Sequence, residues 1–226
     1  MSQIVLQNVT KTYALGNQSI HAVNNASLMI EKGEFISIVG HSGSGKTTLL
    51  SLIGGITNPS AGTILFEDKD IFSQGSDLLS EYRCEKVGFM FQFASLLPML
   101  TVRENLLLPT AFSVQKGPGV GAGQKAVELL GMVGLTDKVE AYPSQLSGGQ
   151  QRRVAIARAF MNNPAVVLAD EPTGDLDEET EMDMMDFFRT MNRTHGVTFI
   201  MVTHNTDLAK QTGRRIKMHQ GSIEEL

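Results

Sequence analysis

One glycine-rich segment of the chain has the residue types and the spacing that hold a polyphosphate. Gly40–Thr47 reads G-H-S-G-S-G-K-T and matches the pattern G-x-x-x-x-G-K-[ST] at every constrained position. Its glycines let the backbone curl around a phosphate, and the start of the following helix adds partial positive charge. We expect Lys46 to reach the β- and γ-phosphates and the Thr47 hydroxyl to bind Mg²⁺. The expected nucleotide contacts in this region are Gly40, His41, Ser42, Gly43, Ser44, Gly45, Lys46, Thr47 and Thr48.

Two carboxylates and a histidine follow two apolar runs later in the chain. Val166–Glu171 reads V-V-L-A-D-E, and Val197–Val202 precedes His204. Ligands of open parallel sheets bind at the carboxyl ends of the strands, where all three side chains are expected. We expect Asp170 to hold Mg²⁺ through water and Glu171 to orient or deprotonate the attacking water. The same edge places His204 to contact the γ-phosphate.

Two further residues are candidate nucleotide or metal contacts. Gln92 follows the predicted strand Val87–Phe91 and is expected to bind Mg²⁺ through its carbonyl oxygen. Its position before a helical region also suits a hinge. Tyr13 lies beside the first predicted strand, where its ring offers a surface for stacking adenine. A tyrosine that only packs against its neighbours fits the sequence about equally well.

A second anion site is predicted at the start of another helix. Leu146–Gln150 reads L-S-G-G-Q and opens the predicted helix Gly149–Met161, so small residues and bare N–H groups meet the positive end of the helix dipole. One chain does not need two phosphate cradles for one ATP. We therefore expect the second cradle to serve the ATP of another subunit. The residues expected to act in trans are Ser147, Gly148, Gly149 and Gln150.

Alternating strands and helices predict an α/β fold with a largely parallel sheet. We expect a single domain over residues 1–226. Within it we expect a small antiparallel layer at about 1–33 and 60–70, a helical subdomain at about 95–145, and a nucleotide-binding core from the remainder. Thr101 and Glu104 form a predicted capping box, and Lys116–Gly123 is a predicted flexible link. Strands are expected over Ile4–Val9, Val23–Ile30, Glu34–Val39, Thr63–Phe66, Val87–Phe91, Ala165–Ala169 and Val197–Val202, and helices over Thr48–Ile53, Thr101–Leu108, Gln124–Val133, Gly149–Met161 and Glu178–Met191.

Composition narrows the class of protein. The 226 residues carry a formal net charge of −5, which argues against a general nucleic-acid binder. The single cysteine, Cys84, allows no intrachain disulfide and favours a reducing compartment. The N-terminus lacks the features of a signal peptide, and no run of about 18 apolar residues occurs. We expect any membrane role to come through a partner. The basic residues Arg152, Arg153, Arg214, Arg215 and Lys217 are predicted to lie on solvated faces.

Together these motifs resemble the ATP-binding subunits of ATP-binding cassette (ABC) transporters over essentially the whole chain. They occur in that family's order: Tyr13 (aromatic loop), Gly40–Thr47 (Walker A), Gln92 (Q-loop), Leu146–Gln150 (signature), Val166–Glu171 (Walker B), Gly174–Asp177 (D-loop) and His204 (switch histidine). Segments such as Gly88–Gln92 (G-F-M-F-Q) and Leu168–Asp177 (L-A-D-E-P-T-G-D-L-D) are similar to the lipoprotein-releasing, macrolide-exporting and antimicrobial-peptide-resistance branch.

The resemblance implies a P-loop ATPase whose two copies close head to tail around two ATP and Mg²⁺. It implies Lys46, Glu171 and His204 as catalytic residues, and an integral membrane permease as partner. The expected location is cytoplasmic, peripheral on the cytoplasmic face of the inner (plasma) membrane. Two alternatives remain open: an ABC ATPase of a non-transport membrane complex, in cell division or peptide sensing, and a soluble ABC ATPase.

Overall fold

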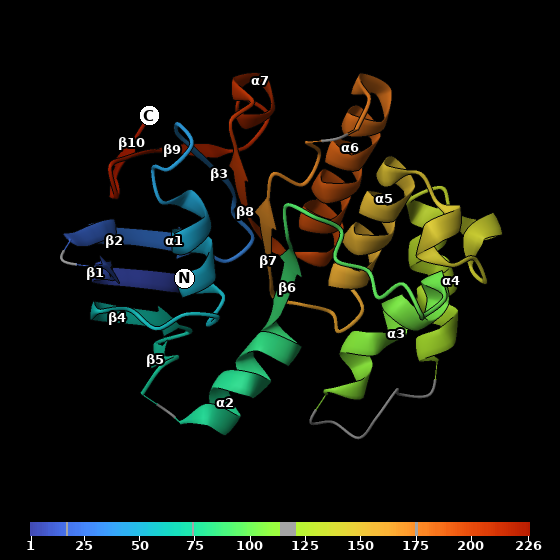
Figure 1. The fold of residues 1–226 in the computed structure, drawn as a ribbon, viewed down its shortest axis with the longest axis horizontal. Coiled ribbons are helices and arrows are strands. Elements are labelled where there is room, and N and C mark those ends of the chain that lie inside the picture. Colours follow the sequence, from blue (N-terminus) through green and yellow to red (C-terminus); the bar gives the residue numbers. More distant parts are fainter. Residues whose placement is uncertain (17, 74, 114–120, 175) are drawn as a thin grey trace.

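The computed structural model describes residues 1–16, 18–73, 75–113, 121–174 and 176–226, which form two sheets flanked by helices (Figure 1). The strands are β1 (Ser2–Leu15), β2 (Gln18–Glu31), β3 (Phe35–Val39), β4 (Ala61–Phe66), β5 (Lys69–Asp70), β6 (Val87–Met90), β7 (Val166–Asp170), β8 (Thr198–Thr203), β9 (Arg214–His219) and β10 (Ser222–Glu225). The helices are α1 (Lys46–Ile53), α2 (Ser76–Glu81), α3 (Val102–Ala111), α4 (Ala122–Met132), α5 (Gly148–Ala159), α6 (Glu178–His195) and α7 (Thr206–Ala209). Short helical turns cover Tyr82–Lys86, Thr136–Lys138 and Pro143–Gln145.

The six-stranded sheet positions the candidate site. Its order is β10-β9-β3-β8-β7-β6, and every neighbouring pair is parallel except β9 and β10. All residues of β7 and β8 are buried, which explains their continuous apolar sequences. Val166 and Leu168 pack into the core that contains α1, while Val167 and Ala169 pack into the core that contains α5 and α6. Helices thus cover both faces of the sheet.

The four-stranded antiparallel sheet, in the order β2-β1-β4-β5, lies beside α1 (Figure 1). Ile4, Leu6 and Ile30 share one core with Leu49 and Leu50 of α1. Strands β1 and β2 run well beyond their predicted ends, because each continues to pair with the other. This extended pairing carries Tyr13 opposite Ile20.

Helices α3, α4 and α5 lie together on the opposite side of the molecule (Figure 1). Leu106, Leu129 and Val154 meet in one buried core there. The predicted capping box is present: Thr101 Oγ1 accepts from the Glu104 N–H at 3.2 Å, and the Glu104 carboxylate accepts from the Thr101 N–H at 2.8 Å. Most of the predicted link, residues 116–120, lies outside the described residues.

The segment between β5 and β6 was not predicted to be helical. It forms α2 and a π-helical turn, and the turn is fixed by Tyr82, whose buried hydroxyl donates to the Ile53 carbonyl at 2.8 Å. This contact between distant segments leaves no periodic signal in the local sequence. In the described ranges, no helix combines the length and the apolar character needed to cross a membrane.

Candidate nucleotide-binding and hydrolysis site

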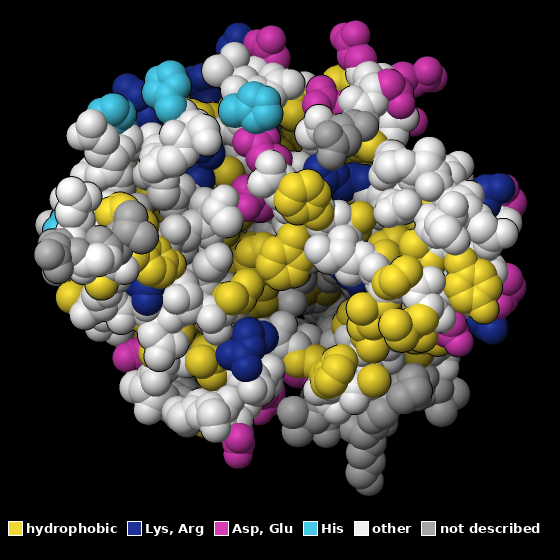
Figure 2. Space-filling view, in the orientation of Figure 1, with side chains coloured by type: hydrophobic (Ala, Val, Ile, Leu, Met, Phe, Trp, Pro, Cys, Tyr) yellow, Lys and Arg dark blue, Asp and Glu magenta, His cyan; other side chains and the backbone are white. Residues whose placement is uncertain are grey.

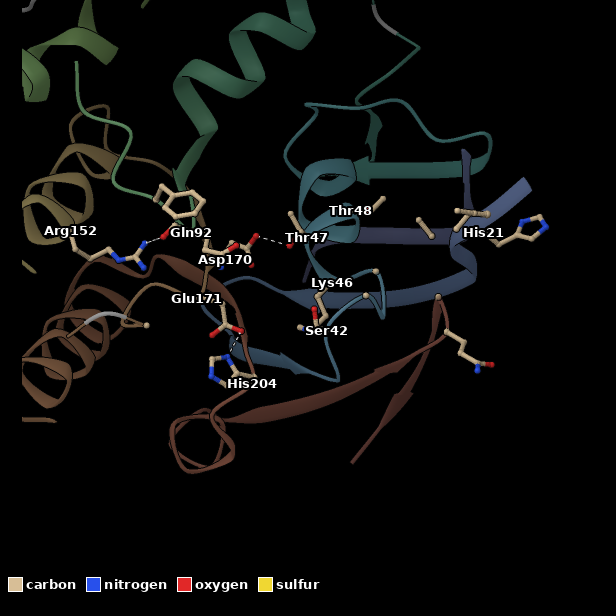
Figure 3. Close-up of a pocket in the computed structure, with 18 residues that line it drawn as sticks. His21, Ser42, Lys46, Thr47, Thr48, Gln92, Arg152, Asp170, Glu171 and His204 are labelled. Atoms are coloured by element: carbon tan, nitrogen blue, oxygen red, sulfur yellow. Dashed lines mark hydrogen bonds and ion pairs between the residues drawn. The ribbon is translucent and has the colours of Figure 1, made fainter. Parts of the chain in front are cut away.

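A cavity of about 790 Å³ opens at the carboxyl ends of β3, β7 and β8 (Figure 3). It gathers residues from the glycine-rich segment, from the segments after β6, β7 and β8, from α5, from the turn between β9 and β10, and from β2 of the antiparallel sheet. The predicted site residues that line it are Ser42, Gly43, Gly45, Lys46, Thr47, Thr48, Gln92, Asp170, Glu171 and His204. The other lining residues are Ile20, His21, Ala22, Phe93, Arg152, Gly174, Gln220 and Gly221.

The glycine-rich segment passes so close to neighbouring backbone that two of its positions leave no room for a side chain. Gly45 has a φ of 105°, and a Cβ there would lie 2.0 Å from the Ala22 carbonyl oxygen. A Cβ on Gly40 would lie 2.2 Å from the Met218 carbonyl oxygen. The backbone can therefore pass so close to its neighbours only with glycine at both positions. This tight path leads directly into the start of α1.

Lys46, the first residue of α1, carries its charge beneath this loop. Its side chain is largely buried, and its Nζ donates to the carbonyl oxygens of Gly40 at 2.8 Å and His41 at 3.0 Å. Two carbonyls compensate part of the cost of burying the ammonium group. A phosphate entering the cavity offers stronger, charged acceptors to the same amine.

Thr47 and Asp170 meet across the floor of the cavity. The Thr47 hydroxyl donates to Asp170 Oδ2 at 2.7 Å, and Gln92 lines the same cavity (Figure 3). Burial raises the pKa of Asp170; the Thr47 hydrogen bond opposes this shift, the Glu171 charge adds to it, and the charges of Lys46 and Arg152 oppose it. A hydroxyl, a carboxylate and an amide oxygen are hard donors, so this set fits Mg²⁺.

Glu171 and His204 form a pair at the ends of β7 and β8. Glu171 Oε1 lies 2.8 Å from His204 Nδ1, and the Glu171 N–H donates to the Val202 carbonyl at 2.9 Å. Glu171 has a φ of 48°, a left-handed conformation that costs a non-glycine residue of the order of 1–3 kcal/mol. Its carboxyl group is held at the mouth of the cavity by this backbone and by the exposed His204 ring.

Four predicted contacts do not line the cavity: Tyr13, Gly40, His41 and Ser44. Gly40 and His41 take part through the carbonyls that bind Lys46. The Ser44 hydroxyl is buried and has no hydrogen-bond partner among the residues that the structure describes. The Tyr13 ring is half exposed on β1, with the Lys11 amine 5.2 Å from its centroid, and its strand partner Ile20 is the residue that reaches the cavity.

The second predicted anion site also lies away from this cavity. Ser147 caps α5, since its Oγ accepts from the Gln150 N–H at 3.2 Å and the Gln150 Oε1 accepts from the Ser147 N–H at 3.0 Å. Ser147 and Gly148 are exposed. The start of α5 is therefore accessible to a ligand that lies outside the chain's own nucleotide cavity.

Arg152 is a cavity residue that the sequence reasoning missed. The prediction of a solvated side chain is wrong, because Arg152 is only 4% exposed. Its Nη1 donates to the Phe91 carbonyl at 3.0 Å and also to the Gln92 carbonyl. In the sequence, Arg152 and the adjacent Arg153 resemble part of a basic surface patch. Only the packing of α5 against the end of β6 shows that Arg152 is buried. Asp175 of the predicted D-loop lies outside the described residues, while Asp177 caps α6 by accepting from the Thr180 N–H at 2.9 Å.

Comparisons with known proteins agree with this geometry. The family model described as ABC transporter matches residues 23–174. An ABC transporter ATP-binding protein of Methanocaldococcus jannaschii, MJ0796, is 42% identical over 98% of this chain and 95% of its own length. The lipoprotein-releasing system ATP-binding protein LolD of Myxococcus xanthus is 40% identical over the full length of both. The macrolide export ATP-binding/permease protein MacB of Syntrophobacter fumaroxidans is 40% identical over 99% of this chain, which spans only 31% of MacB.

A solved structure gives the same architecture. The dimeric MJ0796 cassette in a post-hydrolysis state with ADP and phosphate superposes with a TM-score of 0.93, at 40% identity over 99% of this chain and 98% of that one. The predicted fold class, a P-loop α/β core with an antiparallel layer and a helical subdomain, is confirmed. The division into those parts at the predicted boundaries stays a prediction.

Proposed function

This chain belongs to the ABC transporter family, and we propose that it is the ATP-hydrolysing subunit of an export-type transporter complex that acts as a head-to-tail dimer. One observation carries the proposal. Thr47, Asp170, Glu171 and His204 come from three separate segments and converge on the cavity beside the Lys46 amine. A polyphosphate, its metal ion and an attacking water each find a chemically matched group there.

We assign roles to these groups from their chemistry. Lys46 and the backbone amides of the glycine-rich loop hold the phosphates of ATP. Thr47, Gln92 and, through water, Asp170 would hold Mg²⁺, which supplies charge neutralisation at the phosphates when bound. Glu171 orients the attacking water and accepts its proton, while His204 stabilises charge at the γ-phosphate. We also propose that Tyr13 stacks on the adenine at the edge of the cavity, because its strand partner Ile20 lines the cavity.

The dimer follows from the separation of the two anion sites. Ser147, Gly148, Gly149 and Gln150 lie outside the chain's own cavity, with Ser147 exposed at the start of a twelve-residue helix. We propose that they contact the ATP held by a second copy. The dimeric state of the solved MJ0796 cassette supports this arrangement. ATP then stabilises the closed dimer because it contacts both copies only in that state.

A membrane partner has a matching surface on this chain. A groove of about 440 Å³ lies between α2 with its following turn, β6, α3 and α5, and it is bordered by Phe89, Pro109 and Phe112 and by the charged side chains of Arg83 and Arg158. Figure 2 shows hydrophobic side chains gathered on this face, and Phe112 is 71% exposed. We propose that a cytoplasmic segment of an integral membrane permease occupies the groove, which places the chain peripherally on the cytoplasmic face of the inner (plasma) membrane. The permease portion named in the MacB relative supports this partner.

Purification of the tagged chain from mild-detergent membranes tests this function. We expect one integral membrane protein to be retained by the natural chain and by Met132→Glu, which changes an exposed apolar residue on α4, outside the groove. We expect Phe112→Glu to release that protein. Recovery of the chain without a membrane protein, or equal retention by both variants, would contradict the proposed partner and its site.

A further inference from the structure

The segment after β6 has irregular backbone, and two arginines of α5 bind its carbonyl groups. Arg152 donates to the carbonyls of Phe91 and Gln92. Arg158 donates to the carbonyls of Ala94, at 2.9 Å, and Ser95, at 3.0 Å. Backbone carbonyls outside helices and strands need partners wherever water is excluded. Arg152 and Arg158 thus donate hydrogen bonds to four of the five backbone carbonyls of residues 91–95.

Arg152 is the more deeply placed member of this pair. Its buried cation has the two carbonyls as acceptors and lies at the same cavity as Asp170 and Glu171. It also reaches the segment after β7, because a Cβ added to Gly174 would lie 3.7 Å from its Nη2. A buried guanidinium is expensive unless its donors are used, so these contacts favour one fixed position of the side chain.

We propose that Arg152 is a positioning residue for ATP hydrolysis: with Arg158 it clamps Phe91–Ser95 onto α5 and thereby holds Gln92 at the metal-binding edge of the cavity. The consequence for the metal site rests on the proposed function, in which Gln92 contacts Mg²⁺. The clamp also connects the Gln92 segment to α5, which begins at the exposed Ser147 cap. In the proposed dimer, this start of α5 contacts the nucleotide of the other copy. Figure 3 shows Arg152 reaching Gln92 from the helix side of the cavity.

A spin label at Phe93 tests the clamp independently of catalysis. Phe93 is 74% exposed and sits between the clamped carbonyls, so a nitroxide on Phe93→Cys, in a Cys84→Ser background, reports the mobility of the segment. We expect Arg152→Gln and Arg158→Gln each to sharpen the room-temperature spectrum. Arg153→Gln is the matched control, since that guanidinium donates to the Val133 carbonyl at 3.0 Å instead. An unchanged spectrum in Arg152→Gln, or equal sharpening in the control, overturns the clamp.

Metal dependence tests the positioning role. By calorimetry, we expect Arg152→Gln to raise the Mg²⁺ concentration needed to tighten ATP binding by about tenfold, and to weaken ATP binding less in EDTA than in Mg²⁺. Arg152→Lys keeps the charge but loses the planar fork, and we expect it to restore part of the Mg²⁺ response. An equal loss of ATP affinity with and without Mg²⁺ would mean a general structural role and would refute positioning.

Gln92→Ala separates this inference from the function on which it rests. If Gln92→Ala raises the Mg²⁺ requirement and Arg152→Gln does not, the positioning role is refuted and the metal site stands. If Gln92→Ala has no effect, the proposed metal role of Gln92 fails. The clamp is then judged by the spin-label spectra alone.

Discussion

Removal of the Lys46 amine is the perturbation whose effect on ATP binding can be worked out most directly. In the structure, Nζ donates to the carbonyls of Gly40 and His41, beneath the glycine-rich loop that we propose encloses the phosphates. When ATP binds, the ammonium group exchanges these neutral acceptors for charged phosphate oxygens. Lys46→Ala deletes that gain, together with the two hydrogen bonds to the loop carbonyls.

The magnitude follows from the strength of charged hydrogen bonds. One hydrogen bond to a charged group contributes about 1.5–3 kcal/mol net. Two contacts with phosphates therefore contribute about 3–6 kcal/mol, and the two carbonyl hydrogen bonds given up in exchange offset about 1–3 kcal/mol, so we expect a net loss of about 3 kcal/mol. Because 1.4 kcal/mol corresponds to a tenfold change, the dissociation constant for ATP should rise about 100-fold.

Isothermal titration of ATP measures this change, and Lys125→Ala provides the control. The Lys125 amine donates to the Met161 carbonyl at 2.7 Å and to Asn163 Oδ1 at 2.6 Å, away from the cavity. It therefore has similar partners without a phosphate to bind. Unchanged ATP affinity in Lys46→Ala, or an equal loss in Lys125→Ala, would refute the assignment of Lys46 to the phosphates.

Two further variants test the candidate metal site and the helical subdomain that contains α3, α4 and α5. Burial raises the pKa of Asp170 in the folded chain. The protonated carboxyl group therefore stabilises the fold fully at pH values below the unfolded pKa of about 3.9, and this stabilisation is lost as the pH rises through the raised folded pKa. We therefore expect Asp170→Asn to be more stable than the natural chain without Mg²⁺, by a margin that grows with pH in urea unfolding, and a margin that shrinks would contradict this. Thr101→Ala removes the capping box of α3 and should cost about 1 kcal/mol in unfolding free energy. Its ATP affinity should be unchanged, and a fall in affinity would show that the cap also shapes the nucleotide site.

The predictable parts of this protein are those in which local sequence and chemistry coincide. The glycine-rich loop, the acidic end of β7 and the cap at Thr101 each depend on neighbouring residues, and the structure places them where the sequence predicts. The convergence of Asp170 and His204 on one cavity was also predictable, because parallel strands bring their carboxyl ends to one edge of the sheet.

The structural features that the sequence did not predict depend on contacts between segments that are distant in the sequence. Tyr82 is fixed by a carbonyl in α1, and this bond shapes a helical turn that has no local signature. Arg152 is buried only because α5 packs against the end of β6, so its type and its neighbours alone favour a solvated position. The extension of β1 to Leu15 likewise depends on continued pairing with β2.

The oligomeric state of Glu171→Gln in ATP and Mg²⁺ tests the central claim most directly. The variant keeps the glycine-rich loop and the Ser147 cap but removes the carboxylate that we propose activates water, so bound ATP should persist and hold two copies together. The chain has a mass of 24.6 kDa, and gel filtration with light scattering should give about twice that value with ATP. Adding Ser147→Arg to the same variant should return it to the monomer. A Glu171→Gln chain that remains at 24.6 kDa in saturating ATP would contradict the head-to-tail dimer.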